Sequence, residues 1–395
     1  MHTAVLPDSS RDFSMVLGGP LYQLLLRLRV VREPLDLLTR RIIVIALVAW
    51  VPLLFLSVAG GRAWSGVKVP FLYDVDAHVR FLASLPLLIL AEWVVHLRFR
   101  PIVLQFLDRN IITEEVRPQF DSIIQSSMRL RNSVVAELFI VLVVLVIGPL
   151  VWRNQAAIQS STWYADVDAG GMRLTLPGYF YRYVSLPIFQ FILLRWYFRL
   201  FIWYRFVWKV SRLNLNLLPT HPDGAGGLGF LTGTAHAMAP LLIAQSALLA
   251  GLIANRIFYE GAKLPAFKME ILAIAVFLLL QALAPLFLFI GKLAACQRQG
   301  NREYGVLASR YTADFHRKWI KDQDANAGEL LGTGDIQSLA DLGNSFAVIR
   351  SMSLVPFNRG TVVRLAVMTL LPMLPLTLTV IPFEELVERL IKAIL

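Results

Sequence analysis

Five basic side chains occur at the spacing of a single helix face between residues 195 and 212. They are Arg195, Arg199, Arg205, Lys209 and Arg212. At 100° per residue these positions fall within an arc of about 140°. Guanidinium and ammonium groups bind carboxylate and phosphate oxygens. This basic stripe therefore predicts an anion path, contact with acidic lipid headgroups or movement with voltage. Only Arg195 and Arg199 lie deep in the span, whereas a voltage sensor needs regular three-residue spacing through the membrane centre.

A glycine-rich segment, HPDGAGGLGFL at 221–231, follows the basic stripe. Four of the six residues from 224 to 229 are glycine: Gly224, Gly226, Gly227 and Gly229. Such a segment lets backbone N–H groups approach an anion, and the positive end of the following helix faces the same region. His221 and Asp223 add groups for proton transfer or ion contact. The alternative is a tight connection that Pro and Asp shape, without the GK[ST] ending of a nucleotide-binding loop.

Ionisable residues also lie inside the apolar segments, where each costs about 2.5–3.5 kcal/mol at the bilayer centre unless it faces protein or water. In the topology given below, five fall in the cytoplasmic halves of their spans: Glu92, His96, Glu137, Arg195 and Arg199. We expect the two glutamates to pair with the two arginines around a polar vestibule that opens to the cytoplasm. The alternative is that Arg199 and His96 reach lipid headgroups and Glu137 only holds helices together.

The composition identifies the solvent in which these side chains must be placed. The chain has 395 residues, of which 56% are hydrophobic and 16% charged, with a mean hydropathy of +0.60. These values exclude a disordered chain and an ordinary cytosolic enzyme. The single cysteine, Cys296, excludes an intrachain disulfide and a Cys/His zinc cluster. We expect no metal and no cofactor.

Apolar windows predict an all-α polytopic membrane helix bundle with about seven spans, forming a single integral membrane domain over residues 1–395. The spans are placed at 42–60, 81–96, 134–152, 183–204, 237–258, 269–291 and 362–382. The second is short and is interrupted by Glu92, so a re-entrant or interfacial helix is the alternative there.

The distribution of Lys and Arg predicts the orientation. The N-terminal segment and residues 97–133, 205–236 and 292–361 hold 24 of the 38 basic residues, whereas the alternate segments hold 10. The N-terminus is therefore expected in the cytoplasm and the C-terminus in the periplasm. The net charge of +11 is explained by insertion and by acidic lipids, so no nucleic acid is expected as a partner.

Helical periodicity extends outside the spans. Residues 97–133 and 297–359 predict a helical layer on the cytoplasmic face. The N-terminal residues Leu17, Tyr22, Leu25 and Leu26 suit a short interfacial helix or, alternatively, a loosely ordered tail, and residues 383–395 suit a helix lying on the outer surface.

Two motifs carry a resemblance. HPDGAGGLGFL at 221–231 and DIQSLADLGNSFAVIRSMSLVPF at 335–357, ahead of the last span, resemble a group of uncharacterised bacterial inner-membrane proteins with HPDxxGGLxFL and IQSLADL-type motifs. The resemblance covers roughly the C-terminal half of the chain. It implies a bacterial inner-membrane location, and the group brings no activity or catalytic residue to transfer.

Three classes of function are compatible with these patterns. The first is a channel or transporter for an anion or small anionic solute, with the basic stripe supplying the field and the glycine-rich segment binding or gating. The second is a membrane enzyme acting on a lipid-linked phosphate or headgroup, with His221 as acid or base and Asp223 orienting it. The third is a membrane-anchored interaction or effector protein. The sequence has no HExxH and no serine-nucleophile motif, so catalytic residues stay unassigned, and it leaves homo-oligomerisation open.

Overall fold

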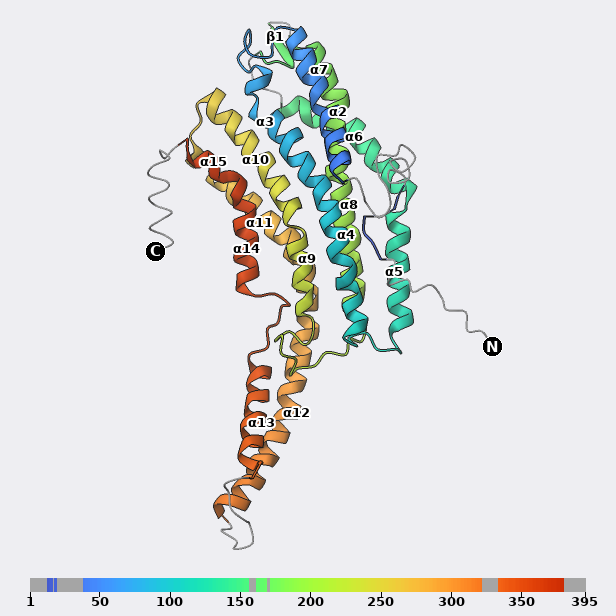
Figure 1. The fold of residues 1–395 in the computed structure, drawn as a ribbon, viewed down its shortest axis with the longest axis vertical. Coiled ribbons are helices and arrows are strands. Elements are labelled where there is room, and N and C mark those ends of the chain that lie inside the picture. Colours follow the sequence, from blue (N-terminus) through green and yellow to red (C-terminus); the bar gives the residue numbers. More distant parts are fainter. Residues whose placement is uncertain are drawn as a thin grey trace, which may run out of the picture.

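The described part of the chain in this computed structural model is residues 13–16, 18–19, 38–155, 161–168, 171–321 and 333–379. These residues form a bundle of long α-helices (Figure 1). A two-stranded antiparallel hairpin, β1 (Ala165–Asp168) and β2 (Gly171–Leu174), lies at one end of the bundle. The protein is an all-α membrane helix bundle, as its hydropathy predicts. The tail predicted at 383–395 and most of the N-terminal interfacial helix lie outside the described residues.

Within the described residues, six helices are long and apolar enough to cross a membrane: Leu38–Ala59, Val75–Asp108, Leu176–Ser211, Gly229–Glu260, Leu264–Lys321 and Arg359–Thr377. Their α-helical segments are α2 (Leu38–Ala59), α3 (Val75–His78), α4 (Leu85–Asp108), α7 (Leu176–Phe180), α8 (Leu186–Ser211), α9 (Thr232–Ala237), α10 (Ala239–Glu260), α11 (Lys268–Leu283), α12 (Ile290–His316), α14 (Arg359–Leu370) and α15 (Leu374–Thr377). Each of the six covers all or most of one predicted span, so the protein is a multi-pass membrane protein.

Two of the predicted spans need a separate comment. The second, expected as a short segment at 81–96, is part of a helix of 34 residues that is long and apolar enough to cross a membrane. The third, at 134–152, lies in α6 (Val134–Gln155), and its apolar stretch among the described side chains is Val134–Val146. The seventh crossing therefore stays a prediction.

The connections gather at the two ends of the bundle in the alternation that the charge count predicts. At one end the segments 61–80 and 161–182 meet, because Val69 forms a bridge with Thr162 and Arg62 forms an ion pair of 2.6 Å with Asp166. At the other end the segments 97–133, 205–236 and 292–361 meet. The Asn216 N–H donates to the Ile111 carbonyl, and the Ser353 N–H donates to the Gly224 carbonyl. The two sets of loops therefore lie at opposite ends of the bundle.

Residues 97–133 do not form one continuous helix. The chain continues α4 to Asp108, turns at Asn110 with a φ of 53°, and returns as α5 (Arg117–Arg131), which packs against α8. The turn reverses the chain because Asn tolerates the left-handed conformation better than most residues. A short break at Asn132 and Ser133 then separates α5 from α6.

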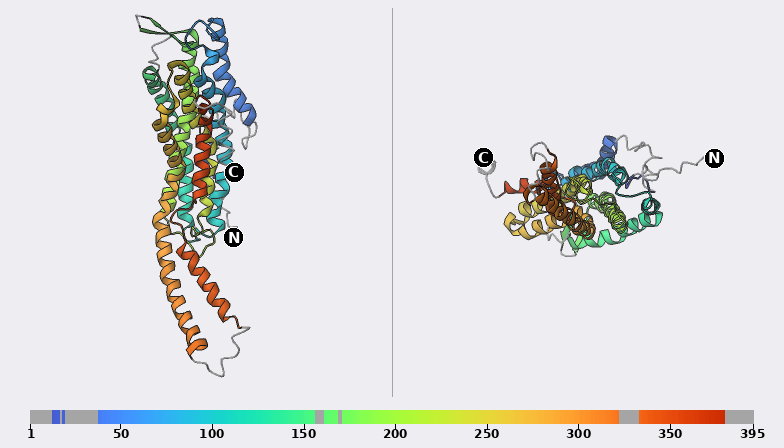
Figure 2. Two further views of the ribbon diagram at one scale, coloured as in Figure 1. Left: turned by 90° about the vertical axis from the view of Figure 1, so that its left-hand side faces the viewer. Right: turned by 90° about the horizontal axis from the view of Figure 1, so that it is seen from below.

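A long helical arm projects from the bundle (Figures 1 and 2). It consists of α12 and the antiparallel α13 (Asp335–Arg350). The helix from Leu264 to Lys321 is continuous apart from a 3₁₀ segment at Ala284–Phe289, which contains Pro285 and separates α11 from α12. At its base the arm is held by the Gln297 side-chain amide, which donates to the Met352 carbonyl at 3.1 Å. The described residues 297–321 and 333–359 therefore form an arm and its return.

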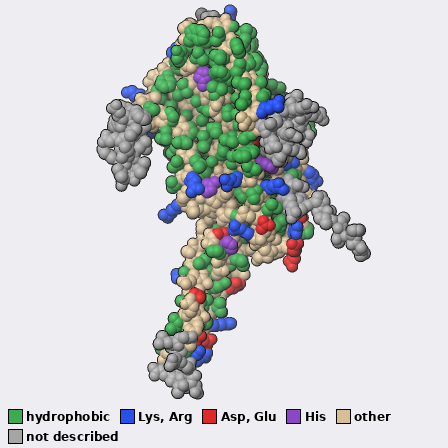
Figure 3. Space-filling view, in the orientation of Figure 1, with side chains coloured by type: hydrophobic (Ala, Val, Ile, Leu, Met, Phe, Trp, Pro, Cys, Tyr) green, Lys and Arg blue, Asp and Glu red, His purple; other side chains and the backbone are tan. Residues whose placement is uncertain are grey.

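The surface matches a chain that stands in a bilayer. Hydrophobic side chains cover the upper part of the molecule, and Lys, Arg and His side chains gather in a band below them (Figure 3). The largest fully buried side chains are aromatic, with Trp163, Trp196 and Trp203 among them. The band of basic residues is the position expected for headgroup contacts at one interface.

Candidate functional site

The centre of the candidate site is one carboxylate that faces guanidinium groups from two helices. Glu92 on α4 is 3% exposed, and its Oε1 accepts from Arg199 Nη1 of α8 at 2.5 Å. Its Oε2 forms an ion pair with Arg41 of α2, and Arg195 Nη1, one turn before Arg199, lies 4.0 Å from Oε1. A carboxylate in an apolar helix bundle needs such partners because burial of an unpaired charge is costly. Glu92 therefore connects α2, α4 and α8.

A second carboxylate extends this cluster toward α6. The Oε1 atom of Glu137 lies 3.4 Å from Arg195 Nε, and both side chains are almost fully buried. Arg131, at the end of α5, lies on the same side, and burial together with the neighbouring Arg199 lowers the pKa of Arg131 to about 10. We call the set of Arg41, Glu92, Arg131, Glu137, Arg195 and Arg199 the arginine cluster.

The arginine cluster carries more basic than acidic groups. Within the described part of the chain it contains four guanidinium groups and two carboxylates. Arg131 donates to two neutral oxygens. Its Nε donates to the Asn132 side-chain oxygen at 3.0 Å, and its Nη1 donates to the Ser14 carbonyl at 2.5 Å. Arg195 Nη2 likewise donates to the Gly18 carbonyl at 3.2 Å. These donors suit an anionic oxygen, since charge-assisted bonds are stronger than bonds to neutral acceptors.

His96, which the sequence grouped with these residues, lies one turn after Glu92 on α4. It is 8% exposed, and its Nδ1 lies 3.0 Å from the hydroxyl oxygen of Ser14. The side chain therefore points into the protein at the edge of the arginine cluster, and does not extend to the headgroups. Its partner comes from the N-terminal segment, for which the sequence predicts an interfacial helix or a loosely ordered tail.

The rest of the basic stripe does not enter the arginine cluster. Arg205 Nη2 donates to the Ser126 hydroxyl of α5 at 3.0 Å, and the guanidinium of Arg212 lies 5.6 Å from the centre of the Trp208 ring. Lys209 is half-buried in the last turn of α8. The stripe thus divides into a buried pair, Arg195 and Arg199, and three residues nearer the helix end.

The glycine-rich segment forms a separate structure at the end of α8. The carboxylate of Asp223 accepts from the backbone N–H groups of Ala225, Gly227 and Gly229 at 2.8, 3.1 and 2.8 Å. Burial acts to raise the pKa of Asp223, but these three bonds and the nearby His221 lower it below its usual value overall. The amide groups expected to hold an external anion are therefore occupied by the chain's own carboxylate.

Glycine is required at several positions of this segment. Gly224, Gly226 and Gly227 have φ values of 61°, 62° and 97°, which side-chain-bearing residues rarely adopt. The carbonyl of Gly224 accepts from the Ser353 N–H at 2.7 Å, so the segment fastens the chain after α13 to the bundle. His221 Nδ1 lies 2.9 Å from Asp223 Oδ1 and completes the loop. These contacts agree with the alternative interpretation of the segment, a tight connection shaped by its own side chains.

The two groups of predicted residues are separated along α8. Arg199 precedes the helix end at Ser211 by roughly 18 Å at 1.5 Å per residue, and the glycine-rich segment begins beyond that end. The structure therefore brings Glu92, Glu137, Arg195 and Arg199 together and keeps His221 and Asp223 apart from them. Arg41, Arg131 and the N-terminal residues of the site were not singled out by sequence. Arg41 at the edge of the first span was the one available signal.

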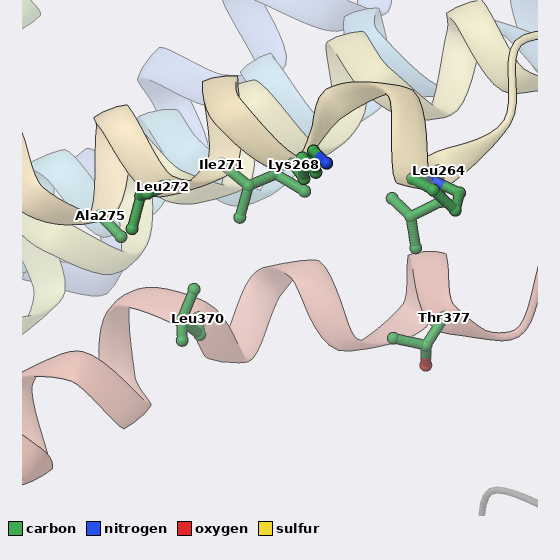
Figure 4. A pocket seen from close by; sticks show the side chains of 8 residues that line it. Leu264, Lys268, Ile271, Leu272, Ala275, Leu370 and Thr377 are labelled. Carbon is green, nitrogen blue, oxygen red and sulfur yellow. The ribbon is translucent and has the colours of Figure 1, made fainter.

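Two surface grooves are lined almost wholly by apolar side chains. One of about 500 Å³ lies between α11 and the α14–α15 segment, where Ile271, Leu272 and Leu370 face it and Lys268 stands at its side (Figure 4). The other, of about 400 Å³, lies between α2, α6 and α8 and includes Val48 and Val141. Apart from Lys268 and Thr377 in the first groove, the lining of both grooves is apolar and suits acyl chains. Among the described residues, no group of three or more His, Cys, Asp and Glu is placed to hold a metal ion.

Comparisons with family models, with curated proteins and with solved structures returned no match for this chain.

Proposed function

We propose that this protein is a membrane transport protein for an anion or small anionic solute, and that the arginine cluster is its binding site. The observation that supports this proposal is the excess of guanidinium groups over carboxylates in the arginine cluster, where Arg131 and Arg195 each donate to a neutral backbone carbonyl oxygen. A purely structural cluster is best stabilised when charges balance, whereas a site for an anion needs donors that a ligand completes. Arginine also presents paired donors that match carboxylate and phosphate.

The location of the site within the bundle supports transport over surface binding. Arg195 and Arg199 are 7% and 3% exposed and lie inside a helix long enough to cross the membrane. Ionisable groups at such depth commonly mark a substrate or ion route. Glu92 and Glu137 hold the guanidinium groups in place, so an anion would meet a preformed arrangement.

We further propose a bacterial inner-membrane location with the N-terminus and the α12–α13 arm in the cytoplasm and the C-terminus in the periplasm. The excess of Lys and Arg in the segments at the arm's end of the bundle supports this orientation. A cysteine at Ser338 in a Cys296→Ala background should react with a membrane-impermeant maleimide only after the cells are opened. Labelling of intact spheroplasts would show that the arm lies outside the cytoplasm and would contradict the proposed orientation.

The transport proposal is tested in proteoliposomes with radiolabelled phosphate and acetate as probes. Arg195→Gln and Arg199→Gln should each reduce uptake about tenfold or more, because a lost charge-assisted bond of about 1.5–3 kcal/mol corresponds to that range. The matched control is Arg212→Gln, which changes the same residue type on the same helix outside the arginine cluster and should leave uptake unchanged. Uptake that is equal in all three variants and the parent protein would remove the proposal.

The projecting arm supports a second candidate, a membrane-anchored interaction protein. Along the arm, Leu307 is 51% exposed and Ile336 48% exposed, so the two helices do not bury each other's apolar faces. The experiment is deletion of residues 302–348, which removes most of the arm and keeps the Gln297 contact. If uptake persists and the cellular phenotype of the protein is lost, the arm carries the function. Loss of uptake with this deletion would instead join the arm to transport.

The third class, a membrane enzyme, is not supported by the site. Asp223 is held by three backbone N–H groups, and His221 contacts it directly. Both side chains thereby shape the loop. For His221 to act as a general base, one ring nitrogen would contact Asp223 and the other would have to face a substrate.

A further inference from the structure

A short N-terminal segment lies inside the protein, beside the arginine cluster. Its described residues are Phe13, Ser14, Met15, Val16, Gly18 and Gly19. The first four are between 1% and 5% exposed, although they come from outside the membrane-spanning helices. A chain segment without regular secondary structure is seldom buried, because its backbone polar groups need partners.

The partners of this N-terminal segment are the guanidinium groups of the proposed binding site. The carbonyl of Ser14 accepts from Arg131 Nη1 at 2.5 Å, and the carbonyl of Gly18 accepts from Arg195 Nη2 at 3.2 Å. A backbone carbonyl offers a partial negative charge at the position where a carboxylate or phosphate oxygen would bind. The backbone carbonyls of the segment therefore occupy the donors that a bound anion would use.

Side chains fix the segment in register. The ring of Phe13 lies 5.2 Å from that of Phe206 on α8, and the Ser14 hydroxyl lies 3.0 Å from His96 Nδ1. The Gly19 N–H donates to the Asn132 side-chain oxygen at 3.1 Å. These contacts join the segment to α4, to the turn between α5 and α6, and to α8. The same part of the fold builds the arginine cluster.

The two glycines allow the close approach. Gly18 and Gly19 have φ values of 135° and 88°, which only glycine adopts readily. A Cβ added at Gly19 would lie 2.7 Å from Glu137 Oε1 and 3.5 Å from Arg195 Nη2, and one added at Gly18 would overlap Arg131 and Asn132 side chains. Side chains at these positions would therefore displace the segment from the site.

We infer that the N-terminal segment is a tethered plug that closes the anion site, and that a small oxyanion carrying a carboxylate or phosphate displaces it. This inference rests on the proposed function, since it concerns the regulation of the same site. The carbonyl oxygens of the plug carry only a partial negative charge but belong to the same chain as the site. The oxygens of the ligand carry a full negative charge and compete for the same guanidinium groups. Plug release is consequently driven by the substrate's own binding, as linkage between the two requires.

Release of the plug is measured without transport by the reactivity of a cysteine placed in it. Met15→Cys in a Cys296→Ala background keeps the contacts of Ser14 and Gly18. In detergent its maleimide labelling should be slow in potassium chloride and at least tenfold faster in potassium phosphate or acetate at equal ionic strength. The matched control, Val306→Cys on the exposed face of α12, should label at the same rate in each salt. Fast labelling of Met15→Cys in chloride, or a rate that ignores phosphate, would overturn the plug.

The lipid composition of nanodiscs distinguishes a soluble anion from a lipid headgroup as the occupant of the site. In nanodiscs of phosphatidylcholine, acceleration that requires added phosphate identifies a soluble anion. In nanodiscs containing phosphatidylglycerol, acceleration without added phosphate identifies a lipid headgroup as the occupant. Arg195→Gln in the Met15→Cys background should abolish the response to either source, because it removes both the anchor of Gly18 and a donor to the anion.

Uptake in proteoliposomes gives an independent measurement. Gly19→Val, which expels the segment by collision with Glu137, and Phe13→Ala, which loosens it without a collision, should each raise uptake several-fold at low phosphate. Two variants are used because either one alone could lower the amount of folded protein, which gel filtration reports. If neither raises uptake while Arg195→Gln still lowers it, the plug is wrong and transport stands. If phosphate accelerates Met15→Cys labelling but no variant takes up any probe, transport is wrong and the plug stands.

Discussion

Removal of the carboxylate that the arginines share should destabilise the protein more than any other single charge change in the bundle. Glu92→Gln keeps the shape of the side chain and one acceptor oxygen, but it removes the negative charge that faces Arg41 and Arg199. Breaking a buried ion pair by removing one partner costs about 3–5 kcal/mol. At an unfolding entropy of about 2.1 cal/mol/K per residue, that loss lowers the midpoint of thermal unfolding by roughly 4–6 °C for a chain of this length.

The measurement is intrinsic-fluorescence melting of the purified protein in one detergent, with Glu270→Gln as the matched control. Glu270 lies exposed in the first turn of α11, so the same chemical change there should move the midpoint by less than about 1 °C. The double variant Glu92→Gln, Arg199→Gln should recover part of the loss, because it removes a guanidinium that the single variant leaves without its carboxylate. A Glu92→Gln midpoint equal to that of the parent would refute the assignment of Glu92 as the counterion that joins α2, α4 and α8.

Two further predictions concern the glycine-rich segment and the glycines of the bundle. Because the folded-state pKa of Asp223 is lowered, its carboxylate stabilises the fold above its unfolded pKa, and this contribution disappears as the pH falls below about 4. Asp223→Ala should therefore lower the free energy of unfolding by about 1–3 kcal/mol at pH 7, and the difference from the parent should shrink in melts below pH 4; a constant difference would contradict the three-bond arrangement. A Cβ at Gly178 would overlap the Tyr164 carbonyl, so Gly178→Ala should destabilise by about 3 kcal/mol, whereas Gly291→Ala in the open first turn of α12 should stabilise by about 0.5–1 kcal/mol. Equal melting of the two alanine variants would show that the backbone at Gly178 yields.

The membrane helices could be predicted from sequence because apolar runs near 20 residues have one stable arrangement in a bilayer. The pairing of Glu92 with Arg199 and of Glu137 with Arg195 followed from the same principle, since an ionisable group in an apolar span must find a partner. Helix bounds were less predictable. The span around Glu92 was expected to be short, because hydropathy falls at Glu92 while the helix itself continues through it.

The relation between the basic stripe and the glycine-rich segment could not be predicted in the same way. A helical wheel gives the angle of a residue about the axis and omits its distance along the axis. It therefore did not show that Arg199 lies roughly 18 Å before the end of α8, whereas the glycine-rich segment begins beyond that end. The contact of Gly18 with Arg195 was also beyond local patterns, because it joins residues 177 positions apart through a segment that has no periodicity. The partners of Asp223 could not be predicted for a different reason. Backbone N–H groups in a glycine-rich segment can bind a carboxylate of the same chain as well as an external anion.

The 3₁₀ segment around Pro285 gives the arm a mechanical consequence. Helix α12 has 27 residues and is about 40 Å long, and it is connected to α11 through a segment with weaker hydrogen bonding than an α-helix. A rotation of roughly 5° at Pro285 would carry the far end of such a rod sideways by about 3.5 Å, the width of an atom. Small rearrangements among the helices in the lipid would thus be magnified into displacements in the aqueous phase, where a second molecule can sense them.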